Sequence, residues 1–149
     1  MARQLADLPQ IICASPDYLA AFGSPVHPDE LESHQCVNFF STTGGINYPI
    51  ELMVNNQKRA YSPKGWVTVN EAENYVICAL RGCGLMQLPR YHVEQALSEG
   101  SLVEVLGDWQ SPKITVSALY IQNRQLSPRV RVFIDWLREI YSSRFPAEG

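Results

Sequence analysis

The segment 66–89, WVTVNEAENYVICALRGCGLMQLP, constrains the fold most, because its hydrophobic period changes twice within a short distance. Alternating apolar residues predict a strand over 66–70, and a short apolar run predicts another over 84–89. Between them, apolar residues recur at the spacing of one helix face and predict a helix over 71–81; they are Ala72, Tyr75, Val76, Ala79 and Leu80. A strand, a helix and a strand joined by short turns predict one unit of an α/β fold.

The ends of this helix are marked by residues that favour helix boundaries. Asn70 is expected to be the N-cap, and Glu73 three residues later completes a pair similar to a capping box. Gly82 is expected in the left-handed position that follows a helix.

The same alternation continues along the rest of the chain. Further strands are predicted at 8–15, 36–40, 101–106 and 114–122, with a hairpin at 50–62 that turns at Asn55-Asn56. Further helices are predicted at 15–23, 27–34, 89–100 and 126–145, where Ser15 and Ser127 are caps and Pro16, Pro28, Pro89 and Pro128 stand in the first turn. We therefore predict an α/β fold with a mainly parallel sheet, in which residues 36–110 form a complete lobe and the flanks supply part of a second.

The composition excludes several classes of protein. Hydrophobic residues make up 46% of the 149 residues and charged residues 18%, which is typical of a folded globular domain. The net charge of −3 and the lack of any Lys or Arg run disfavour a nucleic-acid-binding face. No apolar run is long enough to cross a membrane, and the first residues lack a secretion signal, so we expect a cytoplasmic protein.

Cysteines and histidines are too scattered to predict a metal site. Cys13, Cys36, Cys78 and Cys83 lie in apolar stretches without CxxC spacing, and the histidines are far apart. We expect reduced, buried, structural thiols and no metal or other cofactor.

Two segments that follow predicted strands are candidate ligand-binding residues. Asn70, Glu71 and Ala72 open a helix, whose free N–H groups can bind a polar ligand, although Asn70 could serve only as a cap. Ser41, Thr42, Thr43 and Gly44 offer hydroxyl groups and a flexible backbone, or form no more than a polar turn.

Gly82-Cys83-Gly84 invites a nucleotide-binding interpretation, but its order in the chain argues against it. A dinucleotide-binding loop follows a strand and precedes a helix, whereas these glycines follow a helix and precede a strand. They are better explained by a tight turn and close packing, and no Lys or His adjoins Cys83 to activate its thiol. No catalytic set of residues is evident, so we expect a protein that is not an enzyme.

Four motifs in order resemble a known family. They are ASPDYLAAFGSP, HPDELESHQCVNF, WVTVNEAENYVICALRGCGLMQLPRYHVEQALSEGSLVEVLGDW and ALYIQNRQLSPRVRVFIDWL. Together they resemble the effector-binding domain of LysR-type transcriptional regulators, over residues 4–145.

The resemblance implies a fold like that of periplasmic binding proteins, with two Rossmann-like lobes and a small organic effector bound in the cleft between them. It implies that Asn70, Glu71 and Ala72 line this cleft. It also implies a homodimer or higher oligomer, and DNA binding through a separate helix-turn-helix domain.

This chain departs from the family pattern at its N-terminal side. No helix-turn-helix sequence or linker helix is recognisable, and the first strands of one lobe are missing. We therefore expect a partial first lobe, 1–35 with 111–149, and a complete second lobe, 36–110. Alternatives are an interaction module that oligomerises or modulates an intact regulator, a solute-binding protein, and an enzyme on the same fold.

Overall fold

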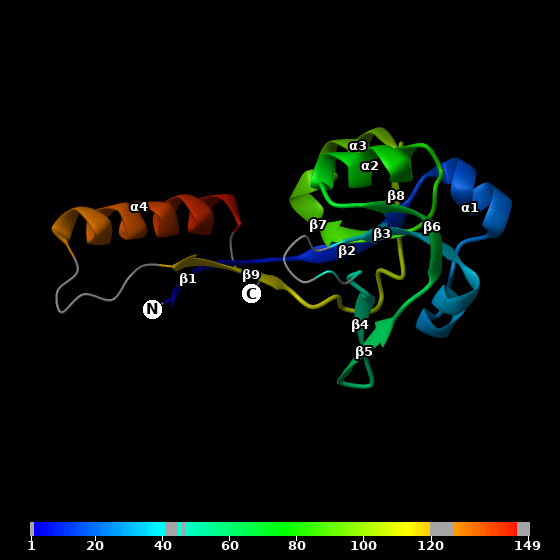
Figure 1. Ribbon diagram of the computed structural model, residues 1–149, viewed down its shortest axis with the longest axis horizontal. Helices are drawn as coiled ribbons and strands as arrows, with labels where there is room; N and C mark the ends of the chain where they lie inside the picture. The colour runs from blue at the N-terminus through cyan, green and yellow to red at the C-terminus, as the bar shows by residue number, and fades with distance from the viewer. Residues whose placement is uncertain (1, 41–44, 46, 120–126, 146–149) are drawn as a thin grey trace. The chain divides into compact units, whose positions relative to one another are not determined.

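The computed structural model describes residues 2–40, 45, 47–119 and 127–145, and it divides into two compact units. The larger unit is residues 10–112, and the smaller unit combines residues 1–9 with 113–149. Both are drawn in Figure 1. The N-terminal segment that the sequence analysis grouped with 111–149 therefore lies mostly in the larger unit, from Gln10 onward.

The larger unit is built on two groups of paired strands. Strand β2 (Gln10–Ala14) lies between β7 (Met86–Pro89) and β8 (Val103–Val105) and is antiparallel to both. Strands β3 (Gln35–Phe39) and β6 (Lys64–Val69) form a parallel pair.

Leu85 joins these two groups into one layer. Its N–H donates to the Gln35 carbonyl at 3.0 Å, and its own carbonyl accepts from the Val37 N–H at 2.9 Å. This is the hydrogen-bonding pattern of a parallel bridge, and it pairs Leu85 with Cys36.

The prediction of a mainly parallel sheet is wrong for the central strand. β2 runs antiparallel to each of its partners, and the hairpin and the strand pair of the smaller unit are antiparallel as well. The link from β2 to β3 contains two helical segments, α1 (Pro16–Phe22) and the 3-10 helix η1 (Pro28–Ser33). After two helical segments the next strand can run in either direction. The alternation of strands and helices in the sequence therefore does not determine whether neighbouring strands are parallel or antiparallel.

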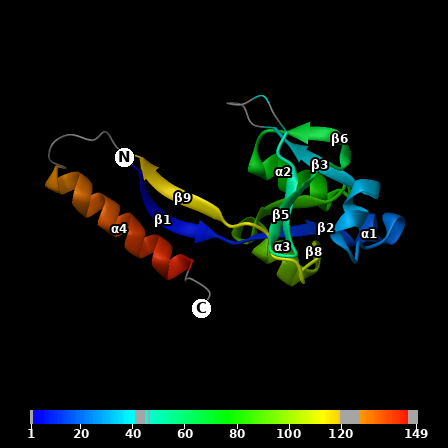
Figure 2. The ribbon, with the colours of Figure 1, turned by 90° about the horizontal axis from the view of Figure 1, so that it is seen from below.

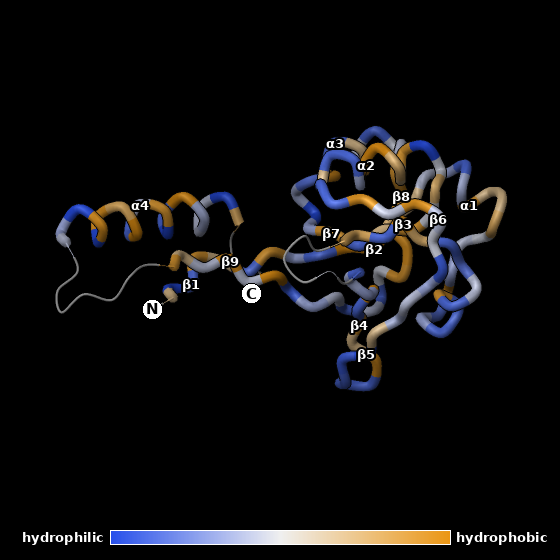
Figure 3. Tube along the Cα trace, viewed as in Figure 1, coloured by the Kyte–Doolittle hydropathy of each residue, from blue (hydrophilic) through white to orange (hydrophobic). Residues whose placement is uncertain are grey.

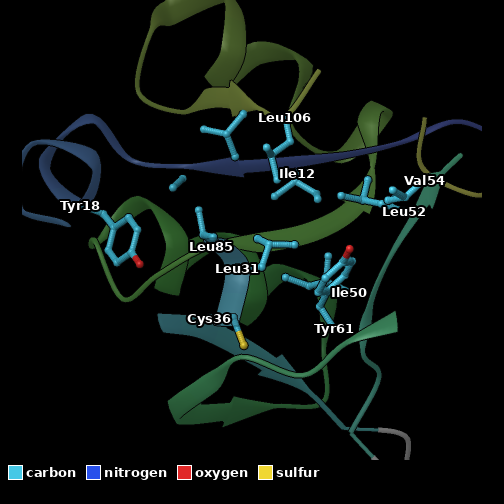
Figure 4. Packing of buried hydrophobic residues seen from close by; sticks show 12 residues of the cluster. Ile12, Tyr18, Leu31, Cys36, Ile50, Leu52, Val54, Tyr61, Leu85 and Leu106 are labelled. Carbon is cyan, nitrogen blue, oxygen red and sulfur yellow. The ribbon is translucent and has the colours of Figure 1, made fainter. Parts of the chain in front are cut away.

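The two faces of this layer have separate apolar cores. In β2, Ile11 and Cys13 point into the core on the side of α2 (Ala72–Leu80), whereas Ile12 and Ala14 point into the other. Figure 1 shows α2 and α3 (Glu94–Glu99) on one face. Figure 4 shows the opposite core, whose labelled residues are Ile12, Tyr18, Leu31, Cys36, Ile50, Leu52, Val54, Tyr61, Leu85 and Leu106.

Two of the predicted local signals are confirmed. The Ser15 Oγ accepts a hydrogen bond from the Tyr18 N–H at 3.1 Å and caps α1. The hairpin of β4 (Ile50–Val54) and β5 (Gln57–Tyr61) turns at Asn55 and Asn56, both with positive φ, 52° and 61°. Positive φ at both central residues is the signature of a type I′ turn.

The single helix predicted over 89–100 is wrong at its start. Pro89 is the last residue of β7, the 3-10 helix η2 covers Arg90–His92, and α3 begins only at Glu94. Val93 separates them because its φ and ψ, −125° and 8°, are not helical. The predicted end is confirmed, since Gly100 closes α3 in the left-handed conformation.

In the smaller unit, β1 (Ala2–Leu8) pairs antiparallel with β9 (Ile114–Leu119), and α4 (Pro128–Arg144) packs against β1. Figure 2 shows the two strands side by side. Arg3 of β1 forms a salt bridge with Asp135 of α4 at 3.3 Å. Ser127 is the N-cap of α4 and Pro128 opens the helix, as predicted, but the Ser127 side chain makes no capping hydrogen bond.

The apolar side chains of α4 are only partly buried. Figure 3 shows hydrophobic and hydrophilic residues alternating along this helix. Ile134 is buried, whereas Val132, Phe133 and Trp136 are 68%, 56% and 53% exposed. Much of its apolar surface therefore faces away from the described residues of the unit.

Candidate functional site

β3 and β6, the strands that precede the two predicted ligand-binding segments in the sequence, end side by side. Phe39 lies opposite Val69 in the parallel register, and the Phe40 N–H donates to the Val69 carbonyl at 2.8 Å. The chain therefore leaves both strands at neighbouring points, at their carboxyl ends. This is the edge at which open α/β sheets bind ligands.

Of the predicted site residues, Ser41, Thr42, Thr43 and Gly44 lie outside the described residues. The chain is described again at Gly45 and from Asn47. Asn47 pairs with Phe40, and the Tyr48 N–H donates to the Phe39 carbonyl at 2.9 Å. Asn47 and Tyr48 thus lie beside the end of β3.

Asn70, Glu71 and Ala72 join β6 to α2, but Asn70 is not the cap. The N-cap is Glu71, with an extended backbone (φ −128°, ψ 140°) and no side-chain capping hydrogen bond. β6 ends at Val69, and Asn70 and Glu71 join it to α2, so the helix begins one position later than predicted. Glu73 is consequently the second helical residue, and the predicted capping box is not formed.

The start of α2 therefore presents backbone donors that no side chain of the cap satisfies. The first N–H to bond back within the helix is that of Tyr75, which donates to the Glu71 carbonyl at 3.0 Å. The N–H groups of Ala72, Glu73 and Asn74 precede it, and no acceptor for them is found among the described residues, so a ligand or water can accept from them. Glu71 and Glu73 are exposed and place negative charge at this helix start. The arrangement suits a neutral hydroxyl, amide or carbonyl group better than a multiply charged anion.

Aromatic rings stand beside these donors. The Phe39 ring lies 5.3 Å from the Tyr75 ring in an edge-to-face arrangement and 6.0 Å from the Tyr48 ring, between centroids. Tyr48 is 60% exposed, whereas Tyr75 is 6% exposed. Tyr48 therefore offers an open ring and a hydroxyl group at the same edge.

The hydroxyl of Tyr75 is a structural acceptor. It accepts a hydrogen bond from the Gln87 N–H at 2.9 Å. The Gln87 side chain accepts from the Glu51 N–H at 2.9 Å and donates to the Glu51 carbonyl at 2.7 Å. Burial raises the pKa of Tyr75, so the phenol stays neutral and holds the wall of the site to β7 and β4.

Sequence reasoning missed Tyr48 and assigned Tyr75 only to the helix stripe. Tyr48 lies in the short segment 46–49 between a polar loop and a hairpin, which shows neither the hydrophobic repeat of a helix nor that of a strand. An aromatic residue directly before Pro49, a few residues after the carboxyl end of a strand, was the available signal.

The glycine pair lies at the opposite end of α2 and has the packing role predicted for it. Gly82 has φ 78° and follows the helix C-cap, Arg81. Gly84 has φ 146°, and a Cβ there would lie 2.7 Å from the Gln35 carbonyl oxygen. Close approach of two backbones, rather than phosphate binding, explains this glycine.

The cysteines are free thiols, but only two of them are buried as expected. Burial raises the pKa of Cys13 to about 12 and that of Cys36 to about 11, so both stay protonated near neutral pH. Cys78 and Cys83 are half-buried, which corrects the prediction for this pair. Among the described residues, no three His, Cys, Asp or Glu side chains gather as a metal site requires, and no helix is long and apolar enough to span a membrane.

Comparison with known families identifies the chain. The family model described as "LysR substrate binding domain" matches residues 1–142. The chain belongs to this family. The resemblance inferred from the four motifs is thereby confirmed, together with the α/β fold like that of periplasmic binding proteins.

Relatives of this LysR substrate-binding domain are transcriptional regulators. The chain is 39% identical over 137 residues to the uncharacterized HTH-type transcriptional regulator YhjC of Escherichia coli, covering 92% of this chain and 46% of the relative. It is 32% identical over 139 residues to the HTH-type transcriptional regulator CrgA of Neisseria meningitidis, covering 93% and 46%. The chain thus spans about half the length of the curated relatives it matches.

Solved structures agree. The regulatory domain of CrgA from Neisseria meningitidis superposes with a TM-score of 0.72 at 32% identity, covering 94% of this chain and 68% of that one. Full-length AphB from Vibrio cholerae gives a TM-score of 0.76 at 26% identity, covering 94% and 47%.

Proposed function

We propose that this LysR substrate-binding domain senses a small, polar organic effector at the carboxyl edge of β3 and β6. The observation that carries the proposal is the uncapped start of α2, residues 70–72, beside the exposed ring of Tyr48. Backbone donors and an aromatic surface together can hold a molecule that has one polar group and an apolar body. Ser41, Thr42, Thr43 and Gly44 are included in the proposed site because they follow β3 in the sequence.

The domain is proposed to be a sensor without catalysis. Its relatives are named as transcriptional regulators, which supports a role in sensing over a role in turnover. We place it in the cytoplasm, where a regulator of transcription acts. The residues 10–112 are proposed to be the second effector-binding lobe, and the smaller unit is proposed to belong to the first.

Binding of DNA is proposed to reside in a part of the intact regulator outside this chain. The relatives carry the description HTH-type and are about twice as long as the matched region. Effector binding would change the DNA contact only if the effector has different affinities for two states of the regulator.

A ligand screen with matched variants tests the sensing proposal. Thermal unfolding is followed with aromatic and aliphatic carboxylic acids, amino acids and sugars, since a ligand of the native state raises apparent stability. A compound that stabilises the chain should lose this effect in Tyr48→Ala, because the exposed ring is removed. Tyr91→Ala is the matched control, since Tyr91 is 42% exposed and lies in η2. Equal shifts in both variants, or no shift with any compound, contradict the proposed site.

We also propose that the chain forms a homodimer or higher oligomer. The exposed Val132, Phe133 and Trp136 of α4 support this, because such apolar surface is commonly covered by a partner. Light scattering across a concentration series measures the mass directly. A monomer at every concentration would contradict association of this chain by itself, while leaving the effector site untouched.

A further inference from the structure

The end of α2 brings two half-buried thiols together. The Cys83 N–H donates to the Cys78 carbonyl at 3.0 Å, and the Gly82 N–H donates to the Ala79 carbonyl at 3.0 Å. With Gly82 at φ 78°, these two bonds make a Schellman motif, whose first and last residues place their side chains in contact. Those two residues are Cys78 and Cys83.

The backbone hydrogen bond limits the separation of the two cysteines. Each Cα lies within one or two covalent bonds of the atoms joined at 3.0 Å, so the Cα atoms are at most about 7 Å apart. Disulfides form up to about this Cα separation. Besides burial, the neighbouring Cys83 also raises the pKa of the Cys78 thiol, which is consistent with two sulfur atoms that lie close together. The pair is thus placed for a bond that would close a short turn.

Exposure separates this pair from the other cysteines. Cys13 and Cys36 are 0% and 5% exposed, and both lie inside the apolar cores. Cys78 and Cys83 are half-buried and lie at the edge of a core, where a small oxidant can reach them. Disulfides in reducing compartments are usually transient and sense redox state.

We propose that Cys78 and Cys83 are a dithiol oxidation site, which a hydroperoxide converts to an intramolecular disulfide and a thiol reductant restores. The Cys83 thiolate attacks one peroxide oxygen, the O–O bond breaks, and Cys83 sulfenic acid forms with release of water or an alcohol. The Cys78 sulfur then attacks the Cys83 sulfur. The S–S bond forms as the hydroxyl group leaves with the Cys78 proton as a second water. Two thiols lose two electrons in total, and the peroxide gains them.

The order of attack follows from the environment of Cys78. Burial raises the pKa of the Cys78 thiol, and the neighbouring Cys83 raises it further. Cys78 is therefore mostly protonated near neutral pH, which suits the second, resolving position better than the first.

Trypsin provides a direct test, because Arg81 stands between the two cysteines. Cleavage after Lys64, Arg81 and Arg90 leaves Cys78 in peptide 65–81 and Cys83 in peptide 82–90, each as its only cysteine. The folded chain is treated with hydrogen peroxide, its remaining thiols are alkylated, and the digest is analysed by mass spectrometry with and without reductant. We expect the two peptides to be joined, and to separate on reduction.

The buried thiols and single variants provide the controls. Cys13 and Cys36 should be alkylated only when the chain is denatured, whether or not it has been treated with peroxide. Cys83→Ser and Cys78→Ser should each yield no joined peptide. The proposal is overturned if both thiols of the pair remain free at a peroxide concentration that oxidises an exposed model thiol. It is equally overturned if they stop at sulfenic or sulfinic acid, or if they pair only between chains. None of these results bears on effector binding.

Discussion

Replacing Gly84 by alanine should destabilise the larger unit much more than the same change at another glycine of positive φ. A Cβ at Gly84 would lie 2.7 Å from the Gln35 carbonyl oxygen and 3.0 Å from the Cys36 Cα. These are backbone atoms, so β3 and the start of β7 would have to separate where Leu85 bonds to Gln35 and Val37. The steric cost is about 1–3 kcal/mol.

The backbone conformation adds a second cost. Gly84 has φ 146°, in a region that residues with a Cβ occupy only at about 1–3 kcal/mol. The total expected loss in the free energy of unfolding for Gly84→Ala is therefore about 2–6 kcal/mol. Gly100 is the matched control, because it has φ 79° but no atom within 4 Å of the added Cβ. Gly100→Ala should cost only about 1–2 kcal/mol.

Urea denaturation measures both losses. A Trp136→Phe background leaves Trp66 and Trp109 as reporters, and both lie in the larger unit. The midpoint should fall much further for Gly84→Ala than for Gly100→Ala at a similar slope. Equal losses in the free energy of unfolding of the two variants would refute this reasoning, because they would show that the β3 backbone shifts to accommodate the added Cβ without an energetic penalty.

Three other predictions concern single side chains. Asn56→Gly should raise the free energy of unfolding by about 0.5–1 kcal/mol, since Asn-Gly is the preferred type I′ pair; an unchanged urea midpoint would argue against this turn type. Tyr75→Phe should lower it by about 1–3 kcal/mol, because the Gln87 N–H loses its acceptor; a loss no greater than that of the exposed Tyr48→Phe would count against this role. Burial lowers the pKa of His34 in the folded chain. Its contribution to the free energy of unfolding should therefore be complete above the unfolded pKa of about 6.5 and should be lost as the pH falls through the lowered folded pKa. Urea midpoints at several pH values measure this effect, and His34→Gln should flatten the acid side of the profile; a slope identical to that of the unchanged chain would exclude His34 as its source.

Local boundary signals were predictable where the decisive contacts lie within a few residues. Ser15 followed by Pro16 marks a helix start whose capping bond reaches only to Tyr18, and the structure has that bond. Asn70 failed as the predicted cap because β6 ends where its pairing with β3 ends, at Val69, and two residues rather than one then join it to α2. Propensity at a single position carries no information about that pairing.

Features that depend on distant partners were not predictable. β1 was missed altogether, because ARQLADL has little alternation and its partner strand lies more than a hundred residues later, where Ala2 pairs with Leu119. The direction of β2 was missed for the same reason. At the candidate site, the residues after β3 and β6 were proposed from chain order alone, whereas Tyr48 comes to the end of β3 only through its hydrogen bond to Phe39.

The central position of β2 determines when the larger unit can acquire its sheet during synthesis. Gln10 to Ala14 are among the first residues of this unit to leave the ribosome, but Cys13 pairs with Met86 and with Glu104. β2 therefore remains unpaired until almost the whole unit has been translated. Contacts of such long range slow folding and leave strand edges open to other chains in the meantime. A nascent chain arrested just before residue 103 should accordingly lack the native exchange protection of β2 that the finished chain shows.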